Sequence, residues 1–525
     1  MKLWLGCIGV TATFTYYKNG LRKSMTDETG TTQYQCNRDS TLRKVTYPDS
    51  KKVLYEYNES GTRKSMTDPF GAITLYLYDN DDRMTKVSLK ESSTGAEATQ
   101  AQYTYTGSVL DTITYGNGLI TQYLYEDGFG RLTGMKHLKG STILNQYSYT
   151  YDNNGNITER TSNGQTVTFG YDELDRIIAS SEANEQYSYD VQGNRTVQLS
   201  TASSLHTDTM DYTYDQANPL KSGTRNGVVT TYKYDGDGLM REKNNGSTTR
   251  FYYDGENIIA EGSISGSAVS FKARYVRGYQ LISMKNQWGT VGYYLENGHG
   301  DVVNLYKQDQ TLLNTYDYDL WGNPKVTEEA DQYSNPFRYA GEYWDTNTGL
   351  QNLRARWYDP SIGRFITEDT WEGRINHPDS QNPYVYVVNN PLRYVDPSGL
   401  KAQAFFSIEA SADFFAGIGV ELKIDSDGKL TFGAEVRLSG NIGAEVSAGI
   451  GGTYSKGDTS NKSGNFNGDT EVDVGGGNSA GLSGTFNDFN NYEISGELRT
   501  GIGTPGTKNS SSNMSRNYES VLYDF

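Results

Sequence analysis

The sequence predicts an all-β protein whose larger part is a spiral of repeated β-hairpins. Three observations support this. Tyrosine is the dominant aromatic residue, with 43 copies against 17 Phe and 6 Trp, and rings with a polar end suit half-buried strands. A motif of alternating tyrosines followed by an acidic turn recurs at intervals of about 20 residues. Sustained helical periodicity is not found before about residue 330.

Each repeat is expected to form one hairpin. Residues i and i+2 of a strand share a face, so a Tyr-x-Tyr pair places two rings side by side. Asp, Asn and Gly then supply the turn, and a Leu-Thr or Ile-Thr strand returns. Copies begin at Tyr55, Tyr123, Tyr149, Tyr171, Tyr187, Tyr212, Tyr232 and Tyr252. Successive hairpins would therefore pair into one long spiralling sheet.

Charge and composition exclude several classes of site. The net charge is −17, which argues against general nucleic-acid binding. Only Cys7 and Cys36 are present, so no disulfide framework or thiolate metal cluster can form downstream. The acidic segments 152–156 and 235–238 lack the twelfth-position Glu of an EF-hand and fit turns better. We expect no metal and no cofactor.

The opening residues are expected to be the first strand or a start within a repeat. Met1–Val10 has one Lys and a short apolar run, but residues 11–17 already have the character of a strand. This makes no convincing signal peptide. No stretch of 18 apolar residues exists in the chain, so no membrane-spanning helix is expected.

The repeats resemble the YD repeats of Rhs proteins, of the C subunits of insecticidal toxin complexes and of the teneurin shell. The resemblance covers roughly residues 12–400 and implies a hollow β-shell that encloses a polypeptide payload. Complete family members have longer shells. A chain of this length would therefore form a partial cocoon with unpaired edge strands, as a fragment or as a piece completed by an upstream shell partner or an N-terminal delivery region.

A second motif follows the repeats and resembles the Rhs repeat-associated core. It contains Arg-Trp-Tyr-Asp-Pro from Arg356 and ends in Asp-Pro-Ser-Gly-Leu at Leu400. The resemblance implies an aspartic-protease-like pair, Asp369 and Asp396, with Arg356 as the supporting cation and a cut between Leu400 and Lys401. Two adjacent carboxyls that share a proton can act as base and acid on one peptide bond.

Three features leave alternatives open at this site. Thr370 follows Asp369 where the family commonly has Pro, which lowers the expectation of full activity. Asp359 and Glu368 compete with Asp369 for the catalytic position. Asp-Pro and Pro-x-Gly are also ordinary turn formers, so these residues could instead form a structural plug at the end of the shell.

The composition changes at Lys401, where Tyr becomes rare and Gly, Ala and Ser increase. Every even-numbered residue is apolar over 402–424, a turn is expected at 425–428, and the alternation continues to residue 450. It favours a Gly-rich antiparallel sheet with one buried face, and it also fits membrane-inserting hairpins. No His or Cys follows Leu400, which excludes a His-metal nuclease, a Cys protease and a Ser-His-Asp triad within this segment.

These features divide the chain into a YD-repeat shell (1–330), a core with the self-cleavage motif (331–400) and a C-terminal effector-like domain (401–525). The favoured hypothesis is a polymorphic-toxin delivery protein for bacterial competition, secreted or at the cell surface as part of a larger protein. Its own C-terminal domain would be the payload, and an immunity protein would be a further partner. The alternatives are a non-catalytic surface protein that binds glycans or partner cells, and an orphan cassette. Cleavage after Leu400 would distinguish them.

Overall fold

The computed structural model describes residues 12–126, 131–200, 210–215, 219–370, 381–400 and 402–404, together with six strands between residues 417 and 499. The chain divides into two compact units, Met1–Ile408 and Glu409–Phe525. In these ranges the regular structure is β, together with short 3-10 turns that include Tyr339–Gly341 and Val387–Asn389. The predicted all-β class is confirmed.

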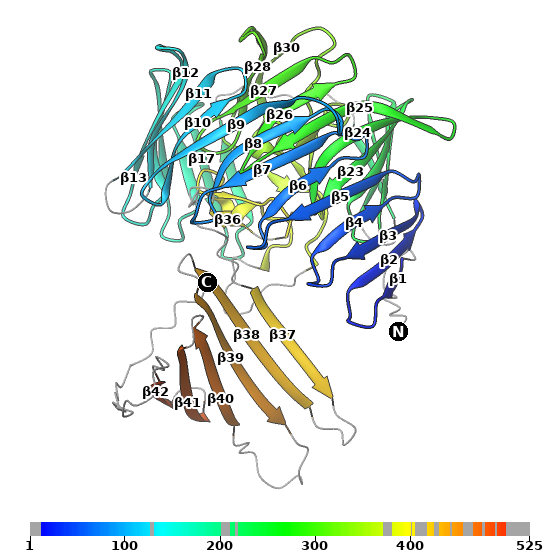
Figure 1. Ribbon diagram of the computed structural model, residues 1–525. Coiled ribbons are helices and arrows are strands. Elements are labelled where there is room, and N and C mark those ends of the chain that lie inside the picture. The colour runs from blue at the N-terminus through cyan, green and yellow to red at the C-terminus, as the bar shows by residue number, and fades with distance from the viewer. Residues whose placement is uncertain are drawn as a thin grey trace. The chain divides into compact units, whose positions relative to one another are not determined.

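The first eighteen strands form one antiparallel sheet in which each strand pairs with its neighbours in the chain, as the curved blue and cyan ribbons of Figure 1 show. They are β1 (Thr13–Tyr16), β2 (Arg22–Asp27), β3 (Gly30–Cys36), β4 (Leu42–Thr46), β5 (Lys52–Tyr57), β6 (Arg63–Thr67), β7 (Ile73–Tyr78), β8 (Met84–Lys90), β9 (Glu97–Thr106), β10 (Val109–Tyr115), β11 (Leu119–Tyr125), β12 (Leu132–Lys139), β13 (Thr142–Tyr151), β14 (Ile157–Ser162), β15 (Gln165–Tyr171), β16 (Ile177–Ser180), β17 (Glu185–Tyr189) and β18 (Arg195–Leu199).

Twelve further strands form a second antiparallel sheet, again in chain order. They are β19 (Met210–Tyr214), β20 (Leu220–Arg225), β21 (Val228–Tyr234), β22 (Met240–Asn244), β23 (Thr248–Asp254), β24 (Asn257–Ser265), β25 (Ala268–Arg277), β26 (Leu281–Asn286), β27 (Val291–Glu296), β28 (Val302–Lys307), β29 (Leu312–Tyr318) and β30 (Pro324–Glu329).

The core segment adds short strands at the end of the first unit. A four-stranded sheet contains β31 (Tyr343–Asp345), β32 (Leu350–Leu353), β33 (Arg356–Asp359) and β34 (Arg364–Phe365), and a two-stranded ribbon joins β35 (Tyr394–Val395) to β36 (Gln403–Ala404). In Figure 1 this yellow segment lies within the curve of the larger sheets.

The second sheet packs against both the first sheet and the core segment. Phe251 and Tyr253 of β23 belong to an apolar cluster with the core segment, whereas Tyr252 between them packs in the cluster of the first sheet. Because successive side chains of a strand point to opposite faces, both faces of β23 are covered. The core segment therefore packs on one face of the second sheet and the first sheet on the other.

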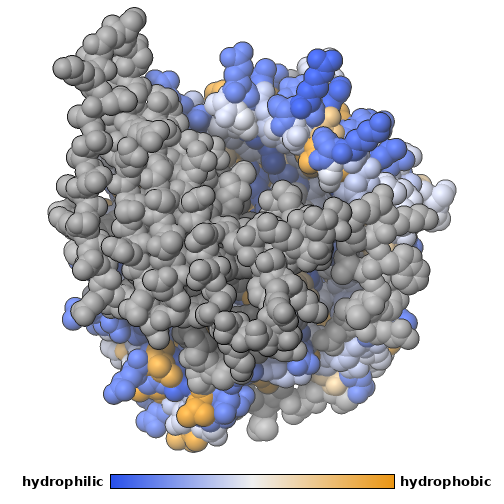
Figure 2. Space-filling model, turned by 90° about the horizontal axis from the view of Figure 1, so that it is seen from below, coloured by the Kyte–Doolittle hydropathy of each residue, from blue (hydrophilic) through white to orange (hydrophobic). Residues whose placement is uncertain are grey.

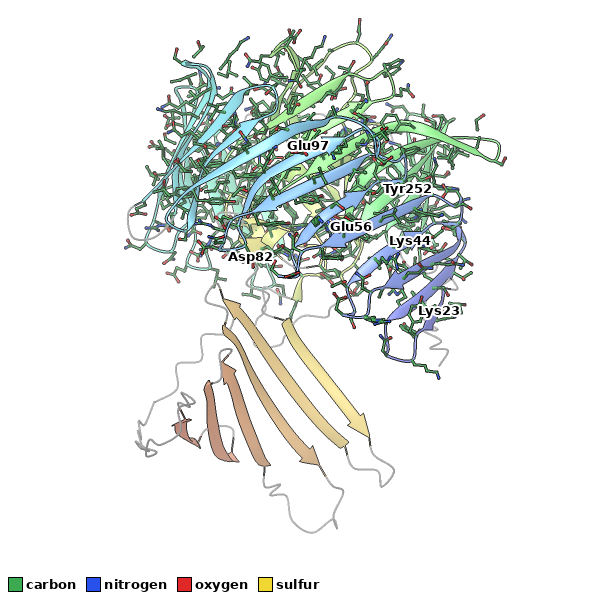
Figure 3. All side chains as sticks on the ribbon, viewed as in Figure 1. Lys23, Lys44, Glu56, Asp82, Glu97 and Tyr252 are labelled. Atoms are coloured by element: carbon green, nitrogen blue, oxygen red, sulfur yellow. The ribbon has the colours of Figure 1, made fainter. Side chains whose placement is uncertain are left out.

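The first sheet has one buried and one solvated face. Val45 and Tyr55 are buried, while Lys44 and Glu56, labelled in Figure 3, alternate with them on the opposite face. This alternation is typical of an antiparallel sheet with water on one side. The coloured part of the face in Figure 2 is likewise mainly hydrophilic, with hydrophobic residues only in small groups.

The tyrosine repeat has a direct structural cause. The tyrosine that ends one strand donates its hydroxyl to the carbonyl that begins the strand before it. The bond runs from Tyr171 to Ile157 at 2.8 Å and from Tyr189 to Ile177 at 2.8 Å. The further instances are Tyr57 to Leu42, Tyr105 to Met84, Tyr151 to Leu132, Tyr234 to Leu220, Tyr253 to Met240 and Tyr318 to Val302. Each repeat is thus tied to the previous one.

Acidic turns join the strands as the sequence predicts. In the 152–156 segment, Asp152 Oδ1 accepts the N–H of Asn156 at 2.8 Å, and Oδ2 accepts its side-chain amide at 2.9 Å. In the 235–238 segment, Asp235 Oδ1 accepts the N–H groups of Asp237 and Leu239, each at 3.0 Å. The carboxylates of both segments therefore satisfy turn backbone groups.

Two strands of the first sheet each have a single partner among the described strands. Among the described strands, β1 pairs only with β2, and β18 pairs only with β17. Val197 and Leu199 of β18 are 42% and 56% exposed. Within the described part of the chain, no helix has the length and apolar character needed to cross a membrane.

The second unit contains a six-stranded antiparallel sheet in chain order. Its strands are β37 (Gly417–Ile424), β38 (Leu430–Gly440), β39 (Ala444–Tyr454), β40 (Phe466–Val474), β41 (Asn478–Asp488) and β42 (Asn491–Arg499). Ile418 pairs with Val436, and Leu422 with Phe432, so even-numbered residues share one face. Residues 405–416 of the predicted 402–424 strand segment and the turn at 425–428 lie outside the described residues. The three-part division of the chain stays a prediction.

Candidate self-cleavage site

The fold brings the three predicted catalytic residues together. Arg356 begins β33, Asp369 follows β34, and Asp396 directly follows β35. Arg356 Nη2 lies 2.8 Å from Asp369 Oδ2 and 3.7 Å from Asp396 Oδ2. The three side chains are 6%, 12% and 4% exposed, so two carboxylates share one cation in a largely dry environment.

Arg356 is held by several further contacts. Its Nη1 donates to the Pro383 carbonyl at 2.9 Å, its Nε donates to the Gly399 carbonyl, and its guanidinium lies 3.7 Å from the centroid of the Phe365 ring. Burial lowers the pKa of Arg356 from its usual value, and the carboxylates of Asp369 and Asp396 oppose that shift. These contacts hold the guanidinium of Arg356 in one position between the two carboxylates.

Asp369 is positioned through its backbone as well. Its N–H donates at 3.0 Å to the same Pro383 carbonyl that accepts from Arg356. The carbonyl of Pro383 thus joins the strand that carries the cation to the loop that carries the carboxylate. This contact aligns two residues that lie thirteen positions apart in the sequence.

Leu400 lies against Asp396. The Leu400 N–H donates to Asp396 Oδ1 at 3.1 Å and to Ser398 Oγ at 3.2 Å, and the Leu400 side chain is 46% exposed. Val395 of β35 pairs with Gln403 of β36, so Leu400 lies in the loop between these strands. Lys401, on the other side of the predicted scissile bond, lies outside the described residues.

The structure distinguishes Asp369 from its two competitors by position. Asp359 accepts the N–H of Ser361 at 2.9 Å and its hydroxyl at 2.5 Å, as a turn residue does. Glu368 is exposed. The ion pairs of Arg356 in the described residues are those with Asp369 and Asp396.

One further residue contacts this segment without belonging to the predicted motif. Arg354, two positions before Arg356, donates from Nη1 to the Pro397 carbonyl and to Glu342 Oε2, the latter at 2.5 Å. The only sequence signal is the Arg-x-Arg spacing that follows the strand Leu350–Leu353. That pattern is common on solvated surfaces and does not by itself indicate a site.

Comparison with known proteins agrees with this architecture. Residues 76–392, more than half of the chain, match the family model described as Teneurin YD-shell. The tRNA3(Ser)-specific nuclease WapA of Bacillus spizizenii is 31% identical over an alignment of 307 residues that covers 54% of this chain and 11% of that protein. A protein described as probable deoxyribonuclease RhsB of Dickeya dadantii is 25% identical, over 56% of this chain and 21% of its own length.

Solved structures show the same fold. The crystal structure of TcdB2-TccC3 matches 74% of this chain and 26% of its own chain, with a TM-score of 0.63 and 19% sequence identity. The chain thus spans only a small part of the relatives it matches. The resemblance to Rhs and YD-repeat shells is confirmed, and the chain belongs to the teneurin YD-shell family.

Proposed function

We propose that this chain is the self-processing part of a polymorphic toxin shell and that it cuts its own backbone between Leu400 and Lys401. The observation that carries the proposal is the shared contact of Arg356 with Asp369 and Asp396, next to the bond from Leu400 N–H to Asp396. Two carboxylates and the predicted cleavage segment meet at one buried cation. That arrangement suits hydrolysis of a peptide bond by an aspartic pair.

The proposed reaction consumes one water molecule. One carboxylate takes a proton from the water, whose oxygen attacks the carbonyl carbon of Leu400, while the other carboxyl donates a proton to the carbonyl oxygen. The tetrahedral intermediate then collapses and the C–N bond breaks. The carboxyl that took the proton from water passes it to the nitrogen of Lys401, which becomes a new N-terminus. The other carboxyl regains its proton from the hydroxyl of the intermediate, and Leu400 becomes a new C-terminal carboxyl group. Arg356 stabilises the negative charge of the pair throughout.

The product after residue 400 would be the effector. In this proposal residues 401–525 are the payload of the shell, an immunity protein is their partner, and the full protein acts outside the producing cell. The relatives WapA and RhsB are described as nucleases. The segment after Leu400 here contains neither His nor Cys, so an effector activity would rest on other side chains.

The test is the intact mass of the purified chain beside an Asp396→Asn variant. The amide keeps the size of the side chain but cannot take up or donate the proton in the same way. We expect the wild type to yield a fragment that begins at Lys401 and the variant to remain whole. An uncut wild type under native conditions would refute self-processing and leave the shell as a binding scaffold.

The burial of the tyrosine rows argues against the glycan-binding alternative. In the described residues, the first tyrosine of several pairs is buried: Tyr55, Tyr123, Tyr149 and Tyr187 are 4%, 5%, 5% and 4% exposed. Sugar stacking requires an accessible ring face, whereas these rings pack within the apolar cluster of the first sheet. These buried tyrosines therefore contribute to the packing of the first sheet.

A further inference from the structure

We propose that Arg354 is a positioning residue that fixes which peptide bond is presented to the aspartic pair. The inference rests on the proposed self-cleavage and extends it to the alignment of the segment before the cut. Arg354 does not contact Asp369 or Asp396 in any described ion pair; its contacts are with the backbone of the cleavage segment and with the shell.

Three consecutive residues of one turn hold three consecutive carbonyls of the cleavage segment. Arg354 Nη1 donates to the Pro397 carbonyl, the backbone N–H of Ala355 donates to Ser398 O at 3.2 Å, and Arg356 Nε donates to the Gly399 carbonyl. Each carbonyl has its own donor in the same order along the chain. A shift of the segment by one residue would change the carbonyl partner of all three donors together.

The next residue along the segment is Leu400, whose N–H bonds to Asp396. The three carbonyl bonds therefore determine which residue reaches the carboxylate. Arg356 contacts both the Gly399 carbonyl and the carboxylates of Asp369 and Asp396. It therefore connects the position of the cleavage segment to that of the catalytic pair. Arg354 contacts the Pro397 carbonyl of the segment but has no described ion pair with Asp369 or Asp396, which makes its contribution separable by experiment.

The approach between the turn and the segment leaves no space for a side chain at Gly399. A Cβ there would lie 2.3 Å from the Leu353 carbonyl oxygen and 3.0 Å from the Arg356 nitrogen. Gly399 also has a φ of +69°, a conformation that favours glycine. Backbone packs directly on backbone, so the alignment depends on the bonds of the turn.

Arg354 is anchored to the shell from its other side. Nε donates to the Glu256 carbonyl at 3.2 Å and Nη2 donates to Asn257 Oδ1 at 3.1 Å, at the turn between β23 and β24. The Glu342 carboxylate provides a charged partner within the core segment. One guanidinium thus joins the second sheet, the core segment and the cleavage segment. Only the planar fork of arginine has enough donors for these acceptors.

The test follows cleavage over time during cell-free synthesis of the full chain, with the cut position determined by mass. We expect Arg354→Ala to slow cleavage by roughly 10²-fold, because a misplacement of about 1 Å is enough for such a loss. We also expect products cut at bonds next to Leu400–Lys401. Arg354→Lys should recover part of the rate. A residue with a merely structural role would change the yield of folded chain without moving the cut.

Two further variants keep the result interpretable. Asn257→Ala removes one anchor of Arg354 without touching the cleavage segment, and it should slow cleavage less than Arg354→Ala does. Arg63→Ala removes an arginine that pairs with Asp254 at the end of the same β23 strand, and it should leave both rate and position unchanged. If Arg354→Ala and Asn257→Ala both cut at the wild-type rate and bond, the positioning role is refuted while self-cleavage stands. An uncut wild type refutes both proposals.

Discussion

Asp396 accepts the backbone N–H of Leu400 at 3.1 Å. A predicted catalytic carboxylate is thus bonded to the residue whose carbonyl it would help to hydrolyse. The contact spans four residues, and Ser398 Oγ also donates to Asp396 Oδ1, at 3.2 Å. The local Asp-Pro-Ser-Gly-Leu turn therefore sets the distance between carboxylate and peptide. Changes to the turn should affect cleavage as directly as changes to the carboxylates.

Gly399→Ala tests the turn. The new methyl would meet the Leu353 carbonyl oxygen at 2.3 Å and displace the segment, so we expect cleavage to fall by about 10²-fold or more. The matched control is Gly164→Ala, since Gly164 also has a positive φ, +84°, but nothing within 4 Å of its Cβ position. Equal cleavage in both variants, measured by intact mass over time, would contradict the prediction.

Asp369→Asn tests the choice among three nearby acidic residues. We expect the variant to remain uncut, because it removes the charge that lies 2.8 Å from Arg356. Asp359→Asn and Glu368→Gln should both cleave within about threefold of the wild type, since surface and turn substitutions away from a site usually have small effects. Loss of cleavage in Glu368→Gln with retention in Asp369→Asn would move the catalytic role to Glu368.

Tyr171→Phe tests the bond that ties consecutive repeats. The Tyr171 hydroxyl donates to the Ile157 carbonyl at 2.8 Å, and its loss should lower the free energy of unfolding by about 1 kcal/mol. Tyr16→Phe, at a ring that is 41% exposed, should change it by less than about 0.5 kcal/mol. Denaturant unfolding of both variants gives the comparison, and equal midpoints would show that the hydroxyl bond does not contribute.

Glu296→Gln tests the pH dependence of stability. Burial raises the pKa of Glu296 to about 8 from a usual value of 4.5, while Arg277 opposes the shift. The folded state therefore binds a proton that the unfolded state has lost between these two pH values. The wild type should lose stability relative to the variant as the pH rises from 4.5 to 8, by at most about 1.4 kcal/mol per pH unit. Parallel unfolding curves of the two proteins across this range would refute the shift.

His137 gives a pH dependence of the opposite sign. Burial lowers the pKa of His137 to about 4 from 6.5, so the unfolded state binds the additional proton between these values. Stability is then fully present above pH 6.5 and is lost as the pH falls toward 4. The Glu296→Gln variant still contains His137. Its free energy of unfolding should therefore still decrease as the pH falls below 6.5.

The repeat made most of the fold predictable. The Tyr-x-Tyr pairs, the acidic turns and the even-numbered apolar residues of the last segment follow from the period of two along a strand. The structure agrees at particular positions: Tyr123 and Tyr125 stack with ring centroids 6.4 Å apart, and Val420 pairs with Ala434. Local chemistry was sufficient because each hairpin pairs with its neighbour in the chain.

The sequence by itself determined the all-β class and the repeated hairpin, since these depend on contacts between residues close in the chain. The residues of the core motif came from the resemblance to the Rhs core. Only the tertiary structure decided that Arg356 contacts Asp369 and Asp396 together, that the second sheet is covered on both faces, and that Arg354 reaches Pro397. Such contacts join residues that are not related to one another by the sequence repeat. They form when separate segments pack, because a buried charge or carbonyl must find a partner wherever the fold brings one.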